Sequence, residues 1–273
     1  MRGSRWGTWR GWLGRAAEGL LECVVEVLSS LLKLSLVLVW GVTATAQETP
    51  IGKQTQKELR VSDSQTVPYL LHLPAGYDAA ADKKWPLMLF LHGRGESFGP
   101  LTLVAKWGPP QIASTDESFP YILVSPQCPR DDSWTSELQQ AALVQLLDQV
   151  LRDHRVDTDR VYLTGLSMGG YGSWKLSAAH PERFAAVAPV CGGGDPAQAE
   201  RLKSMPLWVW HGDRDTAVPI AKSDEMVQAI RAAGSTSVRY TTLEAVGHNS
   251  WSAAYATPEL YAWFNQFTIS ARQ

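Results

Sequence analysis

The sequence predicts an α/β fold in which helices cover both faces of a mostly parallel sheet. Short, continuous apolar runs such as 86–91 and 121–125 are typical of strands buried on both faces. Helix-compatible segments separate these runs, and such an alternation indicates a parallel sheet. Glycine-rich or charged clusters follow the runs. Since open α/β sheets bind ligands at the carboxyl ends of their strands, we expect the functional site at that edge.

The predicted elements follow one another with short connections. The expected strands are 57–61, 66–73, 86–91, 121–125, 161–164, 185–190, 207–210 and 238–243. The expected helices are a weak one over 101–114 that Pro109-Pro110 interrupts, and others over 136–151, 173–179, 196–203, 220–233 and from 257 onward. Ser136 to Gln139 match a capping box, and Pro258 suits a first helical position.

Composition restricts the classes of function. The 273 residues, 45% hydrophobic and 19% charged, fit one large α/β domain. A net charge of −2 gives no basic surface for nucleic acid. Cys128 and Cys191 are expected to be unpaired thiols, with a single bridge between them as the alternative. Without a cluster of His, Cys, Asp or Glu at ligand spacing, we expect neither a metal nor a cofactor.

The first 46 residues differ from the rest and are interpreted as a secretory signal. Arginines precede an apolar run over 31–42, and Ala44-Thr45-Ala46 forms a cleavage pattern. Cleavage after Ala46 would leave a catalytic domain over 47–273, secreted or periplasmic, without a stable membrane association. An uncleaved membrane anchor is the alternative, although 34–42 is too short to span a bilayer alone.

The candidate nucleophile is Ser167, within Gly165-Leu-Ser-Met-Gly169. An apolar strand ends at this motif and a helix-compatible segment follows, which is the context of a nucleophile elbow. The tight turn would raise the Ser167 hydroxyl at the carboxyl edge of the sheet. The backbone N–H of Met168 opens the helix and could face a developing oxyanion. The alternative is a glycine-rich turn that only packs a helix on a strand.

A serine nucleophile needs a base and a carboxylate that orients the base. Of the histidines, His248 lies in a loop after the last strand, whereas His92 and His211 begin strand-end turns and would brace loops. Asp213 and Asp215 both follow the expected strand 207–210, and either could be the carboxylate that orients His248. The order serine, aspartate, histidine is that of the α/β-hydrolases.

Two further groups of residues fall in loops of the same edge. Arg94 is expected to supply a second oxyanion N–H, with Gly95 as the alternative, because neighbouring glycines let the backbone turn toward the site. Trp134, Trp251 and Trp107 could stack on an aromatic or sugar ring of a substrate. The alternative is that these tryptophans only pack the loops.

Four motifs together give the chain its resemblance. They are His92-Gly-Arg-Gly-Glu96, the segment 156–172 around Ser167, His211-Gly-Asp-Arg-Asp215 and Gly247-His-Asn-Ser-Trp251. Over about residues 60–270 the chain resembles α/β-hydrolase serine esterases. The nearest group contains phospholipase/carboxylesterases, polyhydroxybutyrate-depolymerase-like proteins, feruloyl and acetylxylan esterases and peptidase-like members. The resemblance implies an α/β-hydrolase fold and a triad of Ser167, Asp215 and His248.

The resemblance also implies a function. We expect hydrolysis of carboxylic esters through an acyl-enzyme, on short-acyl, feruloyl-type, acetylated polysaccharide or polyester substrates. Segment 192–206 is too short for the large lid that many relatives insert there, so an open cleft is expected. A serine peptidase with the same triad and a non-catalytic surface protein are the alternatives.

Overall fold

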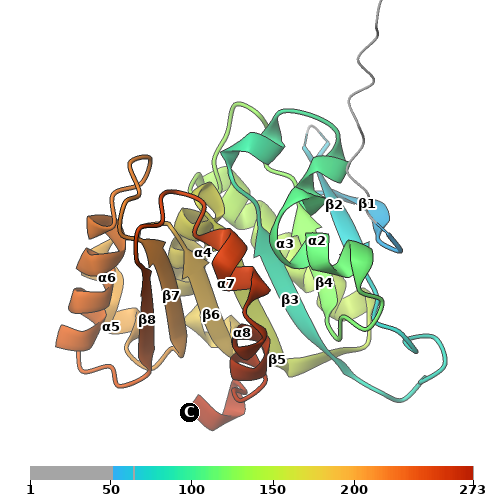
Figure 1. The fold of residues 1–273 in the computed structure, drawn as a ribbon. Coiled ribbons are helices and arrows are strands. Elements are labelled where there is room, and N and C mark those ends of the chain that lie inside the picture. The colour runs from blue at the N-terminus through green and yellow to red at the C-terminus, as the bar shows by residue number, and fades with distance from the viewer. Residues whose placement is uncertain (1–51, 64, 273) are drawn as a thin grey trace, which may run out of the picture. The chain divides into compact units, whose positions relative to one another are not determined.

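The computed structural model describes residues 52–63 and 65–272. The expected signal peptide, and its boundary with the catalytic domain, lie outside these residues. Within them, eight strands form one sheet in the order β1-β2-β4-β3-β5-β6-β7-β8 (Figure 1). Strands β3 to β8 are parallel, and β1 and β2 join one edge in antiparallel pairs. The predicted mostly parallel sheet is therefore confirmed.

The strands lie close to their predicted positions. They are β1 Thr55–Arg60, β2 Thr66–His72, β3 Trp85–Leu91, β4 Ile122–Pro126, β5 Val156–Leu166, β6 Ala186–Val190, β7 Leu207–Gly212 and β8 Val238–Leu243. The largest difference is β5, which begins five residues before the predicted 161. After the buried Val156, residues 157–160 are polar and at least partly exposed, so the segment lacks the apolar pattern on which the prediction rested.

Helices cover both faces of the sheet. The described α-helices are α2 Gly108–Thr115, α3 Glu137–Asp153, α4 Met168–Ala179, α5 Ala199–Leu202, α6 Ala221–Ala232, α7 Trp251–Ala256 and α8 Pro258–Phe264. In Figure 1, α2, α7 and α8 lie in front of the sheet, with α3 and α4 behind it. Helices that connect parallel strands of one sheet must cross its faces, which accounts for helices on both sides.

The core has one layer on each face of the sheet. All seven residues of β3 are buried, and they alternate between the layers. Leu87, Leu89 and Leu91 belong to the layer that contains buried residues of α3, α4 and α6, whereas Met88 and Phe90 belong to the layer that contains those of α2, α7 and α8. Side chains alternate along a strand, so burial on both faces requires a continuous apolar run.

Two helix predictions need correction. The segment 101–114 contains a 3₁₀-helix, η2 Leu101–Lys106, and then α2, in which Pro109 and Pro110 stand in the first turn. The prolines therefore start a helix rather than interrupt one, because the first turn needs no N–H donors. Helix α7 was not predicted, since its six residues are too few to show a periodic pattern.

Of the two hydrogen bonds of the predicted capping box at α3, one is present. Ser136 Oγ accepts a hydrogen bond from the backbone N–H of Gln139 at 3.2 Å. The Gln139 side chain does not reach back to Ser136 but donates to Asp132 Oδ2 at 2.8 Å. The cap thus ties the start of α3 to the loop before it, which borders the site described below.

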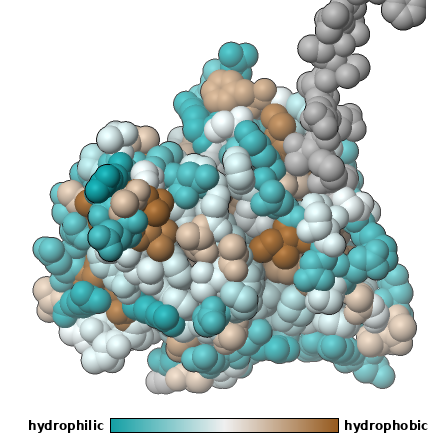
Figure 2. Space-filling view, viewed as in Figure 1, coloured by the Kyte–Doolittle hydropathy of each residue, from teal (hydrophilic) through white to brown (hydrophobic). Residues whose placement is uncertain are grey.

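Both described cysteines, Cys128 and Cys191, are unpaired, as predicted, and both are buried. The surface in Figure 2 carries hydrophobic residues in small separate groups among hydrophilic ones. Across the described ranges, no helix combines the length and apolar composition required to cross a membrane.

Candidate active site

Ser167 stands at the turn between β5 and α4. Its backbone angles are φ 52° and ψ −115°, a strained combination for a residue with a side chain. The crossing is close: a Cβ on Gly165 would lie 2.5 Å from the Gly169 carbonyl oxygen, and one on Gly169 would lie 1.9 Å from that of Leu91. Glycine at both positions permits the turn, which places Ser167 beyond the carboxyl end of β5.

The structure brings Ser167, His248 and Asp215 into one chain of hydrogen bonds. The Ser167 Oγ lies 2.8 Å from His248 Nε2, and His248 Nδ1 lies 2.7 Å from Asp215 Oδ2. An ionised carboxylate can only accept, so Nδ1 carries the proton and Nε2 accepts from the serine hydroxyl. This geometry lets the imidazole take up the serine proton as the oxygen attacks an electrophile.

Asp215 is held as an anion by its surroundings. Its second oxygen, Oδ1, accepts from the backbone N–H groups of Ala217 at 2.9 Å and Val218 at 2.8 Å. Burial alone would raise the pKa of Asp215, but the hydrogen bonds from His248, Val218 and Ala217 outweigh it and lower the pKa. Asp213, the rival carboxylate, is exposed. The carboxylate that bonds to His248 is that of Asp215.

The histidines of the neighbouring turns brace loops, as expected. His211 Nδ1 lies 2.7 Å from Ser223 Oγ, and its Nε2 lies 2.9 Å from the Val218 carbonyl oxygen. This ring thereby supports the turn that carries Asp215. His92 is buried in the loop after β3, where it contacts the backbone on both sides of its ring.

The two predicted oxyanion donors are both first residues of helices. Met168 begins α4, and Arg94 begins the 3₁₀-helix η1, Arg94–Ser97, so neither N–H has an intrahelical partner. The η1 loop lies against the nucleophile, since a Cβ on Gly93 would lie 3.7 Å from Ser167 Cβ. Gly95, the alternative donor, is one residue farther along the same helix.

A shallow hollow of about 300 Å³ opens above Ser167. Its lining residues come from three loops and the start of α4: Arg94, Ser133, Thr135, Ser167, Met168 and Tyr171. Segment 192–206 contains only η4, Pro196–Gln198, and α5, and thus no large lid. Tyr171 and Thr135 were missed in the sequence. For Tyr171 a signal existed, because a residue four positions after the nucleophile lies on the same side of α4.

Comparison with known proteins places the chain in a family. A protein-family model described as "Putative esterase" matches residues 64–256, well over half of the chain. The chain belongs to the Esterase family. The predicted identity as an α/β-hydrolase esterase is thereby confirmed at the level of the family.

Individual relatives agree with the family. "Putative esterase NocK" of Nocardia uniformis subsp. tsuyamanensis is 30% identical over 185 residues, which cover 65% of this chain and 50% of that protein. A poly(3-hydroxyoctanoate) depolymerase of Pseudomonas fluorescens is 27% identical over 53% of this chain and 59% of its own. The chain thus spans about half the length of these curated relatives.

A solved structure shows the same fold with appreciable identity. The crystal structure of a thermostable esterase is 31% identical, with a TM-score of 0.70 over 80% of this chain and 64% of that one. The fold class predicted for this member of the Esterase family is therefore confirmed.

The tryptophans near the candidate site divide into two kinds. The Trp251 ring meets the His248 ring edge-on, with 5.2 Å between centroids, and Trp107 lies 6.1 Å from Trp251. Both line a second hollow of about 300 Å³ between α2 and α7. The prediction that Trp134 contacts substrate is wrong: its side chain is fully buried. Its Nε1 donates to the His92 carbonyl oxygen at 3.0 Å, so the Trp134 side chain stabilises the start of the η1 loop from the protein interior.

One group of possible metal ligands occurs among the described residues. Atoms of Cys191, Asp215 and His248 lie within 4.8 Å of one another. Burial raises the pKa of the Cys191 thiol to about 12, and His248 Nδ1 already donates to Asp215. Since a metal would require a thiolate and a bare imidazole nitrogen, this group is suited to proton transfer rather than to metal binding.

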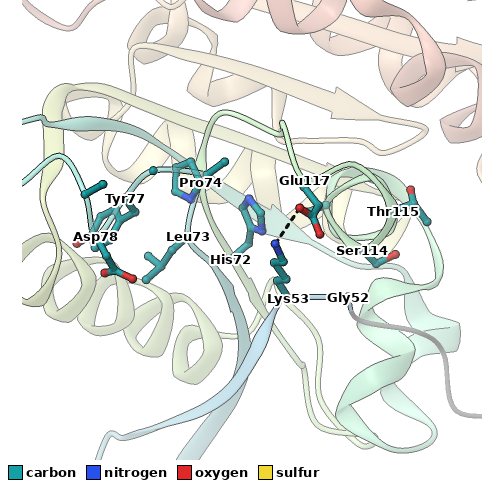
Figure 3. A pocket seen from close by; sticks show the side chains of 14 residues that line it. Gly52, Lys53, His72, Leu73, Pro74, Tyr77, Asp78, Ser114, Thr115 and Glu117 are labelled. Atoms are coloured by element: carbon teal, nitrogen blue, oxygen red, sulfur yellow. Dashed lines mark ion pairs between the residues drawn. The ribbon is translucent and has the colours of Figure 1, made fainter.

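A larger hollow, of about 630 Å³, lies at the opposite edge of the sheet (Figure 3). His72, the last residue of β2, pairs with Leu123 near the start of β4, which places it away from Ser167. Lys53 and Glu117 form an ion pair of 2.8 Å beside it, and both side chains are about 70% exposed. An exposed ion pair of this kind contributes little free energy. The Ser114 and Thr115 hydroxyls that line the same hollow donate to the backbone carbonyls of Gln111 and Ile112 in α2.

Proposed function

We propose that the chain is a serine carboxylic-ester hydrolase with Ser167 as nucleophile, His248 as general base and acid, and Asp215 as the carboxylate that orients it. One observation carries the proposal: the hydrogen bonds from Ser167 Oγ to His248 Nε2 at 2.8 Å and from His248 Nδ1 to Asp215 at 2.7 Å. Membership of the Esterase family supports the same reaction class.

The reaction proceeds in two halves. Ser167 Oγ attacks the ester carbonyl carbon while His248 Nε2 takes its proton, and the N–H groups of Met168 and Arg94 stabilise the oxyanion. The intermediate collapses, the alcohol departs with the proton from His248, and an acyl-enzyme remains. Water then attacks the acyl carbon, His248 again takes and returns a proton, and the carboxylic acid and Ser167 are released.

The site geometry suggests how an ester lies. The leaving oxygen must reach His248 Nε2, so the alcohol part lies toward Trp251 and Trp107. The acyl part then faces the open hollow beside Arg94 and Tyr171. We propose short-acyl, feruloyl-type, acetylated polysaccharide or polyester substrates, because the shallow opening admits polymer-attached esters. The relative described as a poly(3-hydroxyoctanoate) depolymerase supports the polymer option.

Secretion belongs to the same proposal. Residues 1–46 would act as a signal peptide and release a catalytic domain over 47–273. N-terminal sequencing of protein from the medium or periplasm should begin at Gln47, and a start before Gln47 would refute this cleavage.

The decisive test is covalent labelling combined with turnover. The wild-type protein should hydrolyse p-nitrophenyl acetate, and a fluorophosphonate should add one adduct that mass spectrometry locates on Ser167. Ser167→Ala should lose both while its circular dichroism spectrum is unchanged. Labelling elsewhere, or retained hydrolysis in the folded variant, would refute the proposal. A panel of p-nitrophenyl chain lengths, methyl ferulate, acetylated xylan and polyester film then ranks the substrates.

A further inference from the structure

Two carboxylates are buried in the described part of the chain, Asp215 and Glu96. A buried carboxylate is costly unless hydrogen bonds compensate for its lost hydration. Asp215 is explained by its bond to His248. Glu96 is only 5% exposed and lies in η1, just after the carboxyl end of β3. It takes no part in the proposed proton transfer.

The Glu96 carboxylate folds back onto the backbone of its own loop. Burial raises the pKa of Glu96, and the backbone N–H groups of Glu96 and Gly93, which the carboxylate approaches, partly offset this rise. A Cβ on Gly93 would lie 3.2 Å from Glu96 Oε2 and 3.7 Å from Ser167 Cβ. Gly93 therefore lies between this carboxylate and the nucleophile, and a side chain there would disturb both contacts.

The next peptide group is fixed as well. The Gly93 carbonyl oxygen lies 2.6 Å from His92 Nδ1 and accepts from the Glu96 N–H at 3.4 Å. His92 Nε2 accepts a hydrogen bond from the Cys128 N–H at 2.9 Å. Nδ1 therefore carries the proton of the neutral ring and donates it in a hydrogen bond to the Gly93 carbonyl oxygen. In a trans peptide the C=O and the following N–H point in opposite directions. A Gly93 carbonyl that points into the protein therefore directs the Arg94 N–H outward.

We propose that Glu96 is a positioning residue for ester hydrolysis: its buried carboxylate holds the Gly93 N–H and thereby keeps the Arg94 N–H directed at the oxyanion. The inference rests on the proposed function, since it needs an oxyanion at Ser167. Gln127 completes the support, because its Nε2 donates to the Glu96 carbonyl oxygen at 2.7 Å. Glu96 contacts no reacting atom and acts only through the backbone of Gly93 and Arg94.

The test compares loss of the carboxylate with loss of the N–H that it positions. Arg94→Pro removes the N–H, and the site suits proline because it is a first helical position and Gly93 is extended at φ −80°, ψ 177°. Arg94→Ala keeps the N–H and measures the side-chain contribution alone. Glu96→Ala removes the carboxylate, and Glu96→Gln keeps one acceptor oxygen.

Relative to Arg94→Ala, Arg94→Pro should lower kcat for p-nitrophenyl acetate about 100-fold with little change in KM, the usual effect of losing one oxyanion donor. Glu96→Ala should lower kcat by a similar factor, with KM again unchanged, and Glu96→Gln by about tenfold because one acceptor remains. Affinity for a boronic acid, which mimics the tetrahedral intermediate, should fall in parallel. The double variant Arg94→Pro/Glu96→Ala should be no slower than the slower single variant, because both changes remove one interaction.

Leu59→Ala, in the buried face of β1, serves as a control that lowers stability away from the site. It should leave kcat unchanged. Glu96→Ala activity within twofold of wild type, or a double variant with multiplied losses, would overturn the positioning role. If the wild-type protein hydrolyses no ester, the proposed function fails instead, and the boronic acid should then not bind at all.

Discussion

The hollows at the two edges of the sheet differ in what surrounds them. The larger one is lined by side chains that meet solvent, such as the Lys53–Glu117 pair (Figure 3). The smaller one, at Ser167, is backed by two buried carboxylates: Asp215, which bonds to His248, and Glu96, which lies against the η1 loop. Size therefore does not locate the chemistry. Electrostatic interactions gain strength where water is excluded, so a cluster of desolvated, mutually bonded groups is the better guide.

A pair of histidines shows the same contrast. His92 and His72 are both buried, and burial lowers the pKa of each. The two ring nitrogens of His92 bond to the backbone of the η1 loop, at Gly93, and of the loop after β4, at Cys128. In His72, Nε2 lies 3.2 Å from the Phe119 carbonyl oxygen, whereas Nδ1 has no partner among the described residues. His92 is thus the more completely bonded of the two histidines.

The largest expected effect separates the two hollows. Ser167→Ala should lower kcat/KM for p-nitrophenyl acetate by about 10⁴-fold or more, because no other group can form the acyl-enzyme. Lys53→Ala and Glu117→Ala, at the larger hollow, should leave kcat/KM within twofold of wild type. A comparable loss in either of these would show that the opposite edge takes part in the reaction.

Asp215→Asn should cause the next largest loss, about 10³- to 10⁴-fold in kcat, since an amide can stabilise neither the tautomer nor the cation of His248. Asp213→Asn is the matched control two residues away, on an exposed side chain. Steady-state kinetics of both variants decide between the rival carboxylates. Equal losses would remove the distinction drawn from their burial.

The buried His92 predicts an effect of pH on the stability of the protein. Burial lowers the pKa of His92 to about 4, from 6.5. Between these values the unfolded chain binds a proton that the folded chain does not, so unfolding free energy falls as pH falls through this window, by roughly 3 kcal/mol for this residue. His92→Gln should flatten that part of the curve in urea denaturation at several pH values. An unchanged slope would mean that His92 does not stay neutral in the folded protein.

The smallest effect concerns binding beside the base. Trp251→Ala should raise KM for esters of aromatic alcohols about tenfold, the usual value of one lost ring contact, and should change KM for methyl esters less. Trp134→Phe offers the contrast, since Trp134 is buried and supports the loop. It should lower kcat and thermal stability rather than select between alcohols. Kinetics with matched methyl and aryl esters measure the difference.

Much of the fold and the candidate site follows from local sequence patterns. Buried parallel strands need continuous apolar runs, and the elbow needs glycines where a Cβ would meet backbone, as at Gly165 and Gly169. Strands that run parallel bring their carboxyl ends to one edge, so Ser167, Asp215 and His248 were expected near one another although serine and histidine are 81 positions apart in the sequence. The short helix α7 and the first half of β5 lacked such patterns and were missed.

The sequence by itself thus determined the parallel sheet, the elbow and the loops that carry the chemistry, because these depend on period, spacing and the absence of a Cβ. Only the tertiary structure decided which side chains in those loops are buried and which are exposed. Trp134 and Trp251 were both predicted to lie in loops, yet Trp134 is buried next to the η1 loop and Trp251 lies beside His248. Nothing in the sequence around Glu96 indicated that its side chain is buried. Burial depends on contacts between distant segments, which no local pattern contains.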